Sequence, residues 1–545
     1  MPVPPIGAEQ LYHACNLGDL AFETTDDLQP DYSPLGQNRA IDAIQFAISM
    51  PHSGYNLFVS GSAGIGKRLL VSRIIKQEAA KGSAPSDWCY VNNFDEPHQP
   101  GALHRANGGY LVIDARKLLS LPFAWEGLKR ALRNREIRID PLEKLYGMVA
   151  TRSLEPAPIP LDVKVLLIGD RDLYYLLKAY DPDFTSLFKV YADFSEELDR
   201  QAENLPRYIG LICALCREEK LLPLSRDGVA RVIEQSSRFV DDSTRLSLHR
   251  GQILDLLRES AYWAQQKNRS AIEGADVEEA VTTARHRNSQ YAERMQQQIE
   301  QGILMIDTQG SAIGQANALT VIQMGEHRFG RPSRITATAR VGTGRMIDIE
   351  RETKLGGAIH SKGVLILSAF IGNRYARNAP LSLNASLVFE QSYGPVDGDS
   401  ASALELCVLL SAIAGLPLNQ QFAATGSVNQ HGMIQAIGGV NEKIEGFFEV
   451  CRNRGLKGDQ GVIIPTANIQ HLILRRDLVE ACEAGHFHVH AVSTIDEMLA
   501  LLSPKEIGVP DSDSLYPPKT FNGRVQRQLQ DWHEIASKQP SGGQS

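Results

Sequence analysis

A short apolar run, a glycine-rich turn and a helical pattern follow one another early in the chain, and this order constrains the fold more than any other feature. Residues 56–60 are typical of a buried strand, and residues 69–80 have helical spacing. The turn between them contains Gly61, Gly64, Gly66, Lys67 and Arg68. Such a turn surrounds a phosphate with backbone amides and a helix N-terminus, and its lysine serves the terminal phosphates. The sequence therefore predicts a parallel α/β domain with a nucleotide-binding loop.

Two further apolar runs extend the predicted sheet, and each is followed by an acidic residue. Residues 108–113 precede Asp114, and residues 163–168 precede Gly169 and Asp170. A carboxylate at the end of such a strand can hold Mg²⁺ through water. Arg68, however, stands where a Ser or Thr hydroxyl normally ligates the metal. The pattern predicts ATP binding and leaves Mg²⁺ binding and hydrolysis open. The alternative is a retained fold whose loop no longer binds nucleotide.

A second pattern with chemical meaning is the pair of Ser400 and Lys443, which are 43 positions apart. Ser400 follows a glycine- and aspartate-rich turn and precedes apolar residues at helical spacing that end before Gly415. Unpaired amides at a helix start suit an oxyanion formed when a hydroxyl attacks a carbonyl. Buried lysine loses its proton readily and can then act as a base. The pair is predicted to be a nucleophile and its base, in contact at about 3 Å.

The two aspartates beside Ser400 have different expected roles. Two carboxylates next to an oxyanion oppose the developing charge unless one of them points away or orients another group. We expect Asp397 to be an accessory residue of the site. For Asp399, the more common use of Asp before an apolar run is as an N-cap of the helix.

Between Ser400 and Lys443 lie the segments Ala424-Thr-Gly-Ser-Val428 and Gly432-Met-Ile-Gln-Ala-Ile-Gly-Gly439, in the order used by one protease family. Residues from about 315 to 502 resemble the proteolytic domain of the Lon proteases, and the interval between serine and lysine equals that of the family. The resemblance implies Ser400 as nucleophile, Lys443 as base and Thr425 as the hydroxyl that holds the lysine amine.

The first half of the chain is similar to the ATPase of the same family. Residues 35–40 resemble the segment that lies against adenine in ring-forming ATPases, where Asp114 is usually followed by a glutamate that activates water. Here the following residue is Ala115. Only 47 positions separate Lys67 from Asp114, so the large helical insert of the longer Lon-related proteases is missing.

The resemblance implies an AAA+ type α/β domain at 1–197, a helical lid and linker at 198–302, and an α/β Lon-type proteolytic domain at 303–503. Such lids supply an arginine to the nucleotide site, for which Arg250 and Arg258 are candidates beside the simpler interpretation of a charged helix face. Residues 296–301 are polar and are expected to form the linker. Residues 504–545 are rich in Pro, Ser, Gln and Gly, and we expect a disordered tail.

Composition limits the other function classes. The net charge of -8 argues against nucleic-acid binding through bulk charge. No run of about 18 apolar residues and no basic leader followed by an apolar run occurs, so we expect a cytoplasmic protein with no membrane partner. Seven scattered cysteines fit a reducing compartment. The pair Cys213 and Cys216 lies in a helical pattern, and the histidines at 486, 488 and 490 are expected on one strand face, so neither group predicts a metal site.

Taken with the family resemblance, these residues predict a serine endopeptidase that degrades unfolded or damaged proteins, with ATP as a cofactor and a homo-hexameric ring as the implied assembly. The alternative is a nucleotide-gated, chaperone-like binding protein with a vestigial protease site. The intact set of Ser400, Lys443 and Thr425 favours the protease.

Overall fold

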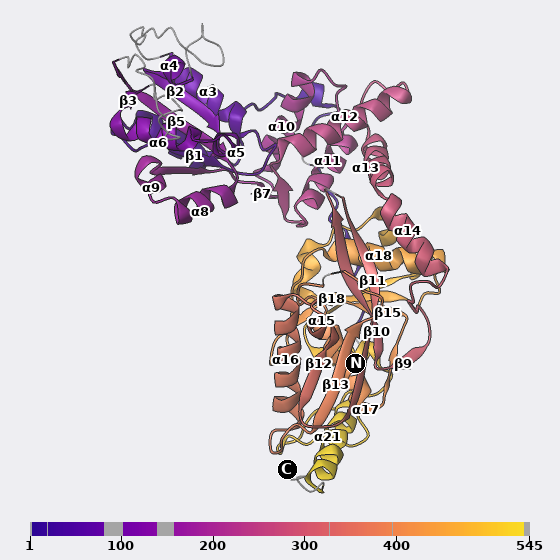
Figure 1. Ribbon diagram of the computed structural model, residues 1–545. Helices are drawn as coiled ribbons and strands as arrows, with labels where there is room; N and C mark the ends of the chain where they lie inside the picture. The colour runs from indigo at the N-terminus through magenta and orange to yellow at the C-terminus, as the bar shows by residue number, and fades with distance from the viewer. Residues whose placement is uncertain are drawn as a thin grey trace. The chain divides into compact units, whose positions relative to one another are not determined.

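The chain forms two compact units in the computed structural model (Figure 1), which describes residues 3–18, 20–80, 102–138, 157–325, 327–394 and 396–538. The N-terminal unit comprises Gly18–Val232 and Arg245–Val277. The C-terminal unit comprises Met1–Leu17, Ile233–Thr244 and Glu278–Ser545. The two units do not coincide with the predicted domain ranges, because residues 1–17, 233–244 and 278–302 belong to the C-terminal unit.

The N-terminal unit is built on a parallel four-stranded sheet, as the strand and helix pattern predicts. Its order is β2 (Gly109–Asp114), β5 (Val163–Gly169), β1 (Leu57–Ser60) and β6 (Val190–Asp193). Alternate residues of β1 enter different cores: Leu57 and Val59 lie in one, Phe58 in the other. Both faces are thus buried, which explains the continuous apolar runs.

Helices cover both faces of this sheet. The first core includes residues of α2 (Asn38–Ser49) and α3 (Lys67–Ala79). The second includes residues of α5 (Ala115–Ser120), α6 (Ala124–Asn134), α8 (Arg171–Tyr180) and α9 (Phe184–Leu187). The smaller elements of the unit are α4 (Ala102–Ala106) and the antiparallel pair β3 (Glu136–Ile137) and β4 (Ile159–Pro160).

The region predicted to be a helical lid is mainly helical. Its elements are α10 (Leu205–Glu218), α11 (Arg226–Phe239), α12 (Arg250–Gln266), α13 (Gly274–Asn288) and the antiparallel pair β7 (Glu197–Asp199) and β8 (Arg245–Ser247). Cys213 and Cys216 are both buried in α10, where Cys213 Sγ lies 3.3 Å from the carbonyl oxygen of Thr25. The polar segment 296–301, predicted as the linker, is largely helical: residues 296–300 form the last part of α14 (Gln290–Glu300), whose Met295 and Ile299 are buried.

A mixed seven-stranded sheet organises the C-terminal unit. Its order is β12 (Arg345–Asp348), β13 (Leu383–Phe389), β11 (His327–Val341), β10 (Gln315–Met324), β15 (Phe422–Ala424), β18 (Gly461–Pro465) and β19 (His488–Val492). Strands β10, β11 and β13 pair antiparallel, whereas β10, β15, β18 and β19 pair parallel. His488 and His490 lie on β19 but His486 precedes it, so the prediction of three histidines on one strand face is wrong.

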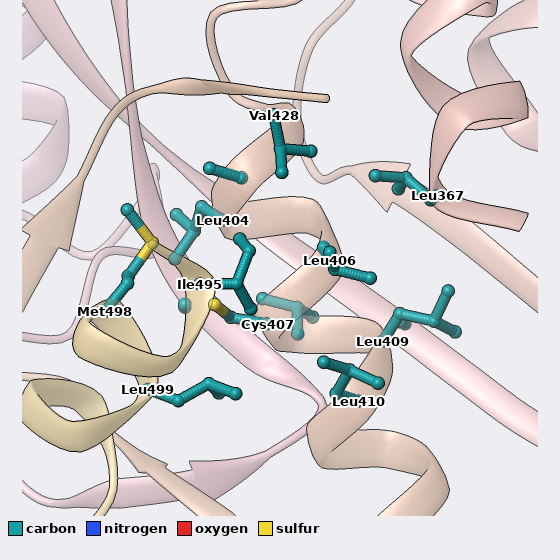
Figure 2. Packing of buried hydrophobic residues seen from close by; sticks show 14 of the residues in the cluster. Leu367, Leu404, Leu406, Cys407, Leu409, Leu410, Val428, Ile495, Met498 and Leu499 are labelled. Atoms are coloured by element: carbon teal, nitrogen blue, oxygen red, sulfur yellow. The ribbon is translucent and has the colours of Figure 1, made fainter. Parts of the chain in front are cut away.

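Two separate cores lie on the faces of this sheet. One contains α16 (Ala358–Tyr375), α17 (Ser402–Ala414) and α20 (Ile495–Leu502), and the other contains α18 (Val440–Asn453) and α19 (Arg476–Glu483). Figure 2 shows side chains of the first core, among them Leu404 and Cys407 of α17 beside Ile495 and Met498 of α20. Helix α17 is buried along nearly its whole circumference.

The remaining elements of the C-terminal unit are short. They are α1 (Ala8–Leu11), α15 (Ile349–Glu352), the 3₁₀ turn Thr466–His471 and two antiparallel pairs, β9 (Ser311–Ile313) with β14 (Pro417–Asn419) and β16 (Ser427–Val428) with β17 (Ile434–Gln435). The beginning of the chain joins this unit because the amide of Ile6 donates to the carbonyl of Val489 at 2.8 Å and Leu11 is buried in the second core.

The prediction of a disordered tail over 504–545 is wrong for residues 504–538. Helix α21 (Phe521–Lys538) places Phe521, Val525 and Leu529 in the same core as α17. These residues have the i, i+4, i+8 spacing of an amphipathic helix, which the polar composition around them obscures. Residues 539–545 lie outside the described part of the chain.

No helix among the described residues is long and apolar enough to cross a membrane.

Replacing Phe521 by alanine is expected to lower the free energy of unfolding of the C-terminal unit by about 3–5 kcal/mol, because a fully buried aromatic ring leaves a cavity in the core beside α17. Equilibrium urea unfolding followed by far-UV circular dichroism measures the change. Ile535→Ala on the same helix is the matched control, since Ile535 is 48% exposed. Equal, small losses in both variants would show that α21 does not contribute to the core.

Candidate active site

Ser400 lies in a turn directly before α17. The helix begins at Ser402, and the amide of Ser402 donates to the carbonyl of Asp399 at 3.0 Å to close the turn. Gly398 has a φ of 102°, a conformation that a side chain strongly disfavours. In the described part of the chain, the amides of Ser400 and Ala401 have no hydrogen-bond acceptor. The predicted arrangement, a serine at a helix start with unpaired amides beside it, is therefore present.

Lys443 lies in the first turn of α18, on the other face of the sheet. The helix approaches β11 backbone to backbone, because a Cβ added to Gly330 would lie 1.9 Å from the carbonyl oxygen of Glu442, and one added to Gly446 would lie 2.4 Å from that of Gly330. Any larger residue at either glycine would push the helix away. This close packing brings the lysine side chain to the sheet.

Residues from the two faces of the sheet come together at the end of β15. Thr425 directly follows the last residue of β15, and its hydroxyl donates to the carbonyl oxygen of Ser400 at 3.0 Å. Lys443 Nζ donates to Ser400 Oγ at 3.0 Å and to Thr425 Oγ1 at 3.0 Å. The contact expected between serine and lysine is thus observed at the expected distance. Thr425 connects both residues.

The lysine amine is almost completely removed from solvent. Lys443 is 2% exposed and Thr425 is fully buried. Burial lowers the pKa of Lys443 to about 8, against the charges of Asp399 and Glu442, which raise it. A large fraction of the amine is therefore neutral at mildly alkaline pH.

The two aspartates behave differently from the expectation. Asp399 is not an N-cap of α17, whose N-cap is Ala401, and its charge acts on Lys443 instead. Asp397 is exposed; its carboxylate accepts from the amide of Gly398 at 2.9 Å and lies against Gly357. Among the described contacts, Asp397 has none with Lys443 or Ser400. These roles depend on the direction of each side chain within a tight turn, and that direction cannot be predicted from the sequence alone.

Two arginines beside the site were missed by the sequence analysis. Arg238, from the end of α11, pairs with Glu442 at 3.1 Å and with Glu445 at 3.0 Å. Arg328 of β11 lies 3.7 Å from Glu442 and pairs with Asp241 at 2.7 Å. The two guanidinium groups partly neutralise the charge of Glu442, the residue directly before Lys443. No local pattern identifies Arg238, because its partner lies 204 positions away.

The glycine-rich loop of the N-terminal unit has the predicted backbone. Gly61, Gly64 and Gly66 have φ values of 148°, 84° and 89°, and α3 begins directly afterwards at Lys67. The Lys67 amine donates to the carbonyl oxygens of Gly61 and Ser62, the latter at 2.9 Å, and burial lowers the pKa of Lys67. The lysine therefore folds back over its own loop.

The acidic residues of this site are engaged locally. Asp114 caps α5 by accepting from the amide of Lys117 at 3.0 Å, and its second oxygen lies 4.0 Å from the Arg68 guanidinium. Asp170 caps α8 and pairs with Arg116 at 2.8 Å. Arg68 thus brings a positive charge to the aspartate that was expected to hold Mg²⁺.

The lid contributes residues to the loop. A Cβ added to Gly64 would lie 2.4 Å from the His249 ring, and one added to Gly66 would lie 3.1 Å from Arg250. Arg250 also pairs with Glu218 at 2.9 Å, whereas Arg258 pairs with Glu219 at 2.8 Å. Of the two candidate arginines, only Arg250 is seen next to the loop.

A cavity of about 70 Å³ lies beside Gly66 and includes Leu35 and Gln37 from the segment expected against adenine. Tyr32, Ile65 and Arg250 also line this cavity. The segment expected against adenine therefore lines a cavity beside the glycine-rich loop.

Family models match three consecutive parts of the chain. Residues 87–195 match "LonB-like, AAA domain", residues 223–287 match "Archaeal LonB, AAA+ ATPase LID domain", and residues 388–503 match "Lon protease (S16) C-terminal proteolytic domain". The order agrees with the domain order predicted from the sequence.

Similar proteins come from bacteria and archaea. A protein of Escherichia coli (strain K12), "Putative Lon protease homolog", is 40% identical over 418 residues, which are 75% of this chain and 69% of that protein. A protein of the same name from Haemophilus influenzae is 34% identical over 79% of this chain and 71% of its own length. The "Archaeal Lon protease" of Thermococcus kodakarensis is 26% identical over 74% and 60%, respectively. With an AAA+ domain, its lid and a Lon proteolytic domain in this order, the chain belongs to the Lon protease family.

Proposed function

We propose that the chain is a serine endopeptidase in which Ser400 is the nucleophile and Lys443 the general base. The observation that carries the proposal is the buried amine of Lys443, which lies 3.0 Å from both the Ser400 and Thr425 hydroxyls. A base needs hydrogen-bond reach to the proton and a pKa near the working pH, and Lys443 satisfies both conditions.

The reaction follows from this geometry. Neutral Lys443 takes the hydroxyl proton of Ser400, and the serine oxygen bonds to the peptide carbonyl carbon while the carbonyl oxygen becomes an oxyanion beside the amides at the start of α17. The leaving amine takes the proton from the Lys443 ammonium as the peptide bond breaks. Water then gives a proton to the same lysine and attacks the carbonyl carbon of the acyl-enzyme. The bond from that carbon to Ser400 Oγ breaks, Oγ takes the proton back from Lys443, and the acid is released.

Thr425 is proposed to position the base. Its hydroxyl hydrogen is directed to the carbonyl oxygen of Ser400, so its oxygen is left to accept from Lys443. The lysine amine is then held by two oxygens at once. This orientation supports proton transfer from Ser400 without a carboxylate in the site. The accessory role expected of Asp397 has no contact to support it.

Unfolded or damaged proteins are the substrates we propose, with ATP bound in the N-terminal unit and a homo-hexamer as the assembly implied by the family. Six cysteines in the described residues are free thiols, which suits a cytoplasmic location. A chaperone-like binding protein with a vestigial protease site is the alternative. The intact hydrogen-bonded set of Ser400, Thr425 and Lys443 disfavours it.

Ser400→Ala and Lys443→Met are each expected to lower the rate of unfolded casein degradation by about a thousandfold or more. The nucleophile and its base act together, and each variant removes one of them. Gel analysis of casein and of its fragments with time is the measurement. Lys457→Met is the control, since Lys457 is exposed on the same unit. Full activity in Ser400→Ala would reject the proposed nucleophile, and no cleavage by an assembled wild-type protein would favour the binding-protein alternative.

The rate of peptide cleavage is expected to rise with pH and to level off above an apparent pKa of about 8, because only neutral Lys443 accepts the serine proton and its ammonium form predominates below that pH. Asp399→Asn is expected to lower the apparent pKa, since the charge of Asp399 raises the pKa of Lys443. A short fluorogenic peptide assayed from pH 6 to 10 gives both values. A flat wild-type profile across this range contradicts the lysine base.

We further propose that the N-terminal unit binds ATP but hydrolyses it slowly. Arg68 occupies the position of the metal-binding hydroxyl, and Ala115 that of the water-activating glutamate. Binding of a fluorescent ATP analogue is expected to be lost in Lys67→Ala. The combined change Arg68→Ser and Ala115→Glu is expected to raise phosphate release, measured with Mg²⁺ present. Rapid hydrolysis by the unchanged protein would overturn this part of the proposal.

A further inference from the structure

Four buried ionisable side chains that do not contact Ser400 or Lys443 among the described contacts gather between β12, α15, α16 and α17. We refer to Asp348, Glu350, His360 and Glu405 as the acid–histidine cluster. Their exposed fractions are 4%, 4%, 2% and 1%, respectively. Asp348 ends β12, Glu350 lies in α15, His360 lies in the first turn of α16 and Glu405 lies in the first turn of α17. Four separate segments therefore meet at this cluster.

The histidine ring lies between two of the carboxylates. His360 Nε2 is 3.3 Å from Asp348 Oδ1, and His360 Nδ1 is 3.7 Å from Glu405 Oε1. One ligand atom from each of Asp348, Glu350 and His360 lies within 4.8 Å of the other two. The Nε2 side of the ring thus faces Asp348, and the Nδ1 side faces Glu405.

The carboxylates lack the partners that buried charges require. The amide of Phe389 donates to Glu350 Oε1 at 2.7 Å, and the amide of Arg351 donates to Asp348 Oδ1 at 3.3 Å. The other oxygen of each group, Asp348 Oδ2 and Glu350 Oε2, is buried without a hydrogen-bond donor, as is Glu405 Oε1. Unsatisfied buried charges of this kind are rare and costly.

Cationic side chains do not supply the missing charge. Across the described ranges, no lysine or arginine forms an ion pair with any of the three carboxylates, and His360 is their only partner of that kind. When all three carboxyl groups are ionised, the cluster has an excess of negative charge even with the imidazole protonated. A divalent cation would favour the ionised carboxylates, balance this excess and satisfy the orphaned oxygens of Asp348 and Glu350 together.

We propose that the acid–histidine cluster binds a divalent transition-metal cation of the Mn²⁺ or Zn²⁺ type. Asp348, Glu350 and His360 Nε2 are the ligands, a mixed oxygen and nitrogen set that suits these ions. Glu405 is the outer carboxylate, 3.7 Å from His360 Nδ1. Its charge favours a proton on Nδ1 and so leaves Nε2 free for the metal, a common arrangement around metal-bound histidine. The cation has a structural role and takes no part in peptide cleavage.

The position of the cluster gives the cation a consequence for the neighbouring site. The segment between α15 and α16 pairs with the approach to Ser400: the amide of Gly357 donates to the carbonyl of Val396 at 2.9 Å, and the amide of Val396 donates to the carbonyl of Leu355 at 2.8 Å. A cation that holds α15, α16 and α17 together therefore stabilises the turn that carries Ser400. This step depends on the proposed function, but metal binding itself does not.

The test measures metal directly on the whole 545-residue chain. After dialysis against EDTA and then metal-free buffer, the protein is titrated with MnCl₂ in the absence of nucleotide, and free Mn²⁺ is followed by electron paramagnetic resonance. One equivalent of Mn²⁺ per chain is expected to bind tightly, Zn²⁺ is expected to displace it, and the melting temperature is expected to rise with added metal. No bound equivalent of either ion in the wild-type protein overturns the proposal.

Variants locate the bound ion. His360→Gln and Asp348→Asn are expected to lose that one equivalent, and Glu405→Gln, which leaves all ligands in place, is expected to weaken binding by about 10–100-fold. His431→Gln is the matched control at an exposed histidine of the same unit. Circular dichroism checks that each variant is folded. If His360→Gln and Glu405→Gln both bind Mn²⁺ as the wild-type protein does, the assignment is wrong.

Discussion

The removal of one ammonium group from water is the constraint on which the candidate site depends. Lys443 is buried among α18, β11 and the end of β15, and within the described ranges its amine donates to two hydroxyls. Burial without a carboxylate partner favours the neutral amine, because a charged one loses its hydration with little in return. The close contact between Gly330 and Gly446 matters for the same reason, since it lets the helix approach until water is excluded.

Charges outside this contact adjust the same amine. Glu442 and Asp399 both raise the pKa of Lys443, and Glu442 is in turn paired with Arg238 and lies near Arg328. The ion pair with Arg238 limits how far the charge of Glu442 raises the pKa of Lys443. The proton affinity of the base therefore depends on Asp399 in the Ser400 turn and on groups from α18, α11 and β11, and not on the serine and lysine alone.

The sequence predicted the parts that local pattern determines. The strand, glycine-rich turn and helix around Lys67 were expected, as were the contact of Ser400 with Lys443 and the helix that ends at Gly415. The N-cap role expected of Asp399 was wrong, and no described contact supports the accessory role expected of Asp397, because the direction of a side chain in a turn depends on the fold. Arg238 was missed because its partners are distant in the chain.

The end of the chain was misjudged for a different reason. The Pro, Ser and Gly content around residues 504–520 outweighed the helical spacing of Phe521, Val525 and Leu529, although that spacing was visible. The buried acid–histidine cluster had no sequence signal of its own, because its members come from four segments between residues 348 and 405 that only the sheet and its helices bring together.

The packing of α21 on α17 also has a consequence for protein synthesis. Helix α17 is apolar on nearly all sides, and part of the core around it is provided by residues 521–529, more than 100 positions later in the chain. While the ribosome is still translating that interval, this side of α17 stays uncovered and exposed to other nascent chains. Completion of the core beneath the serine turn is therefore coupled to the late stages of translation.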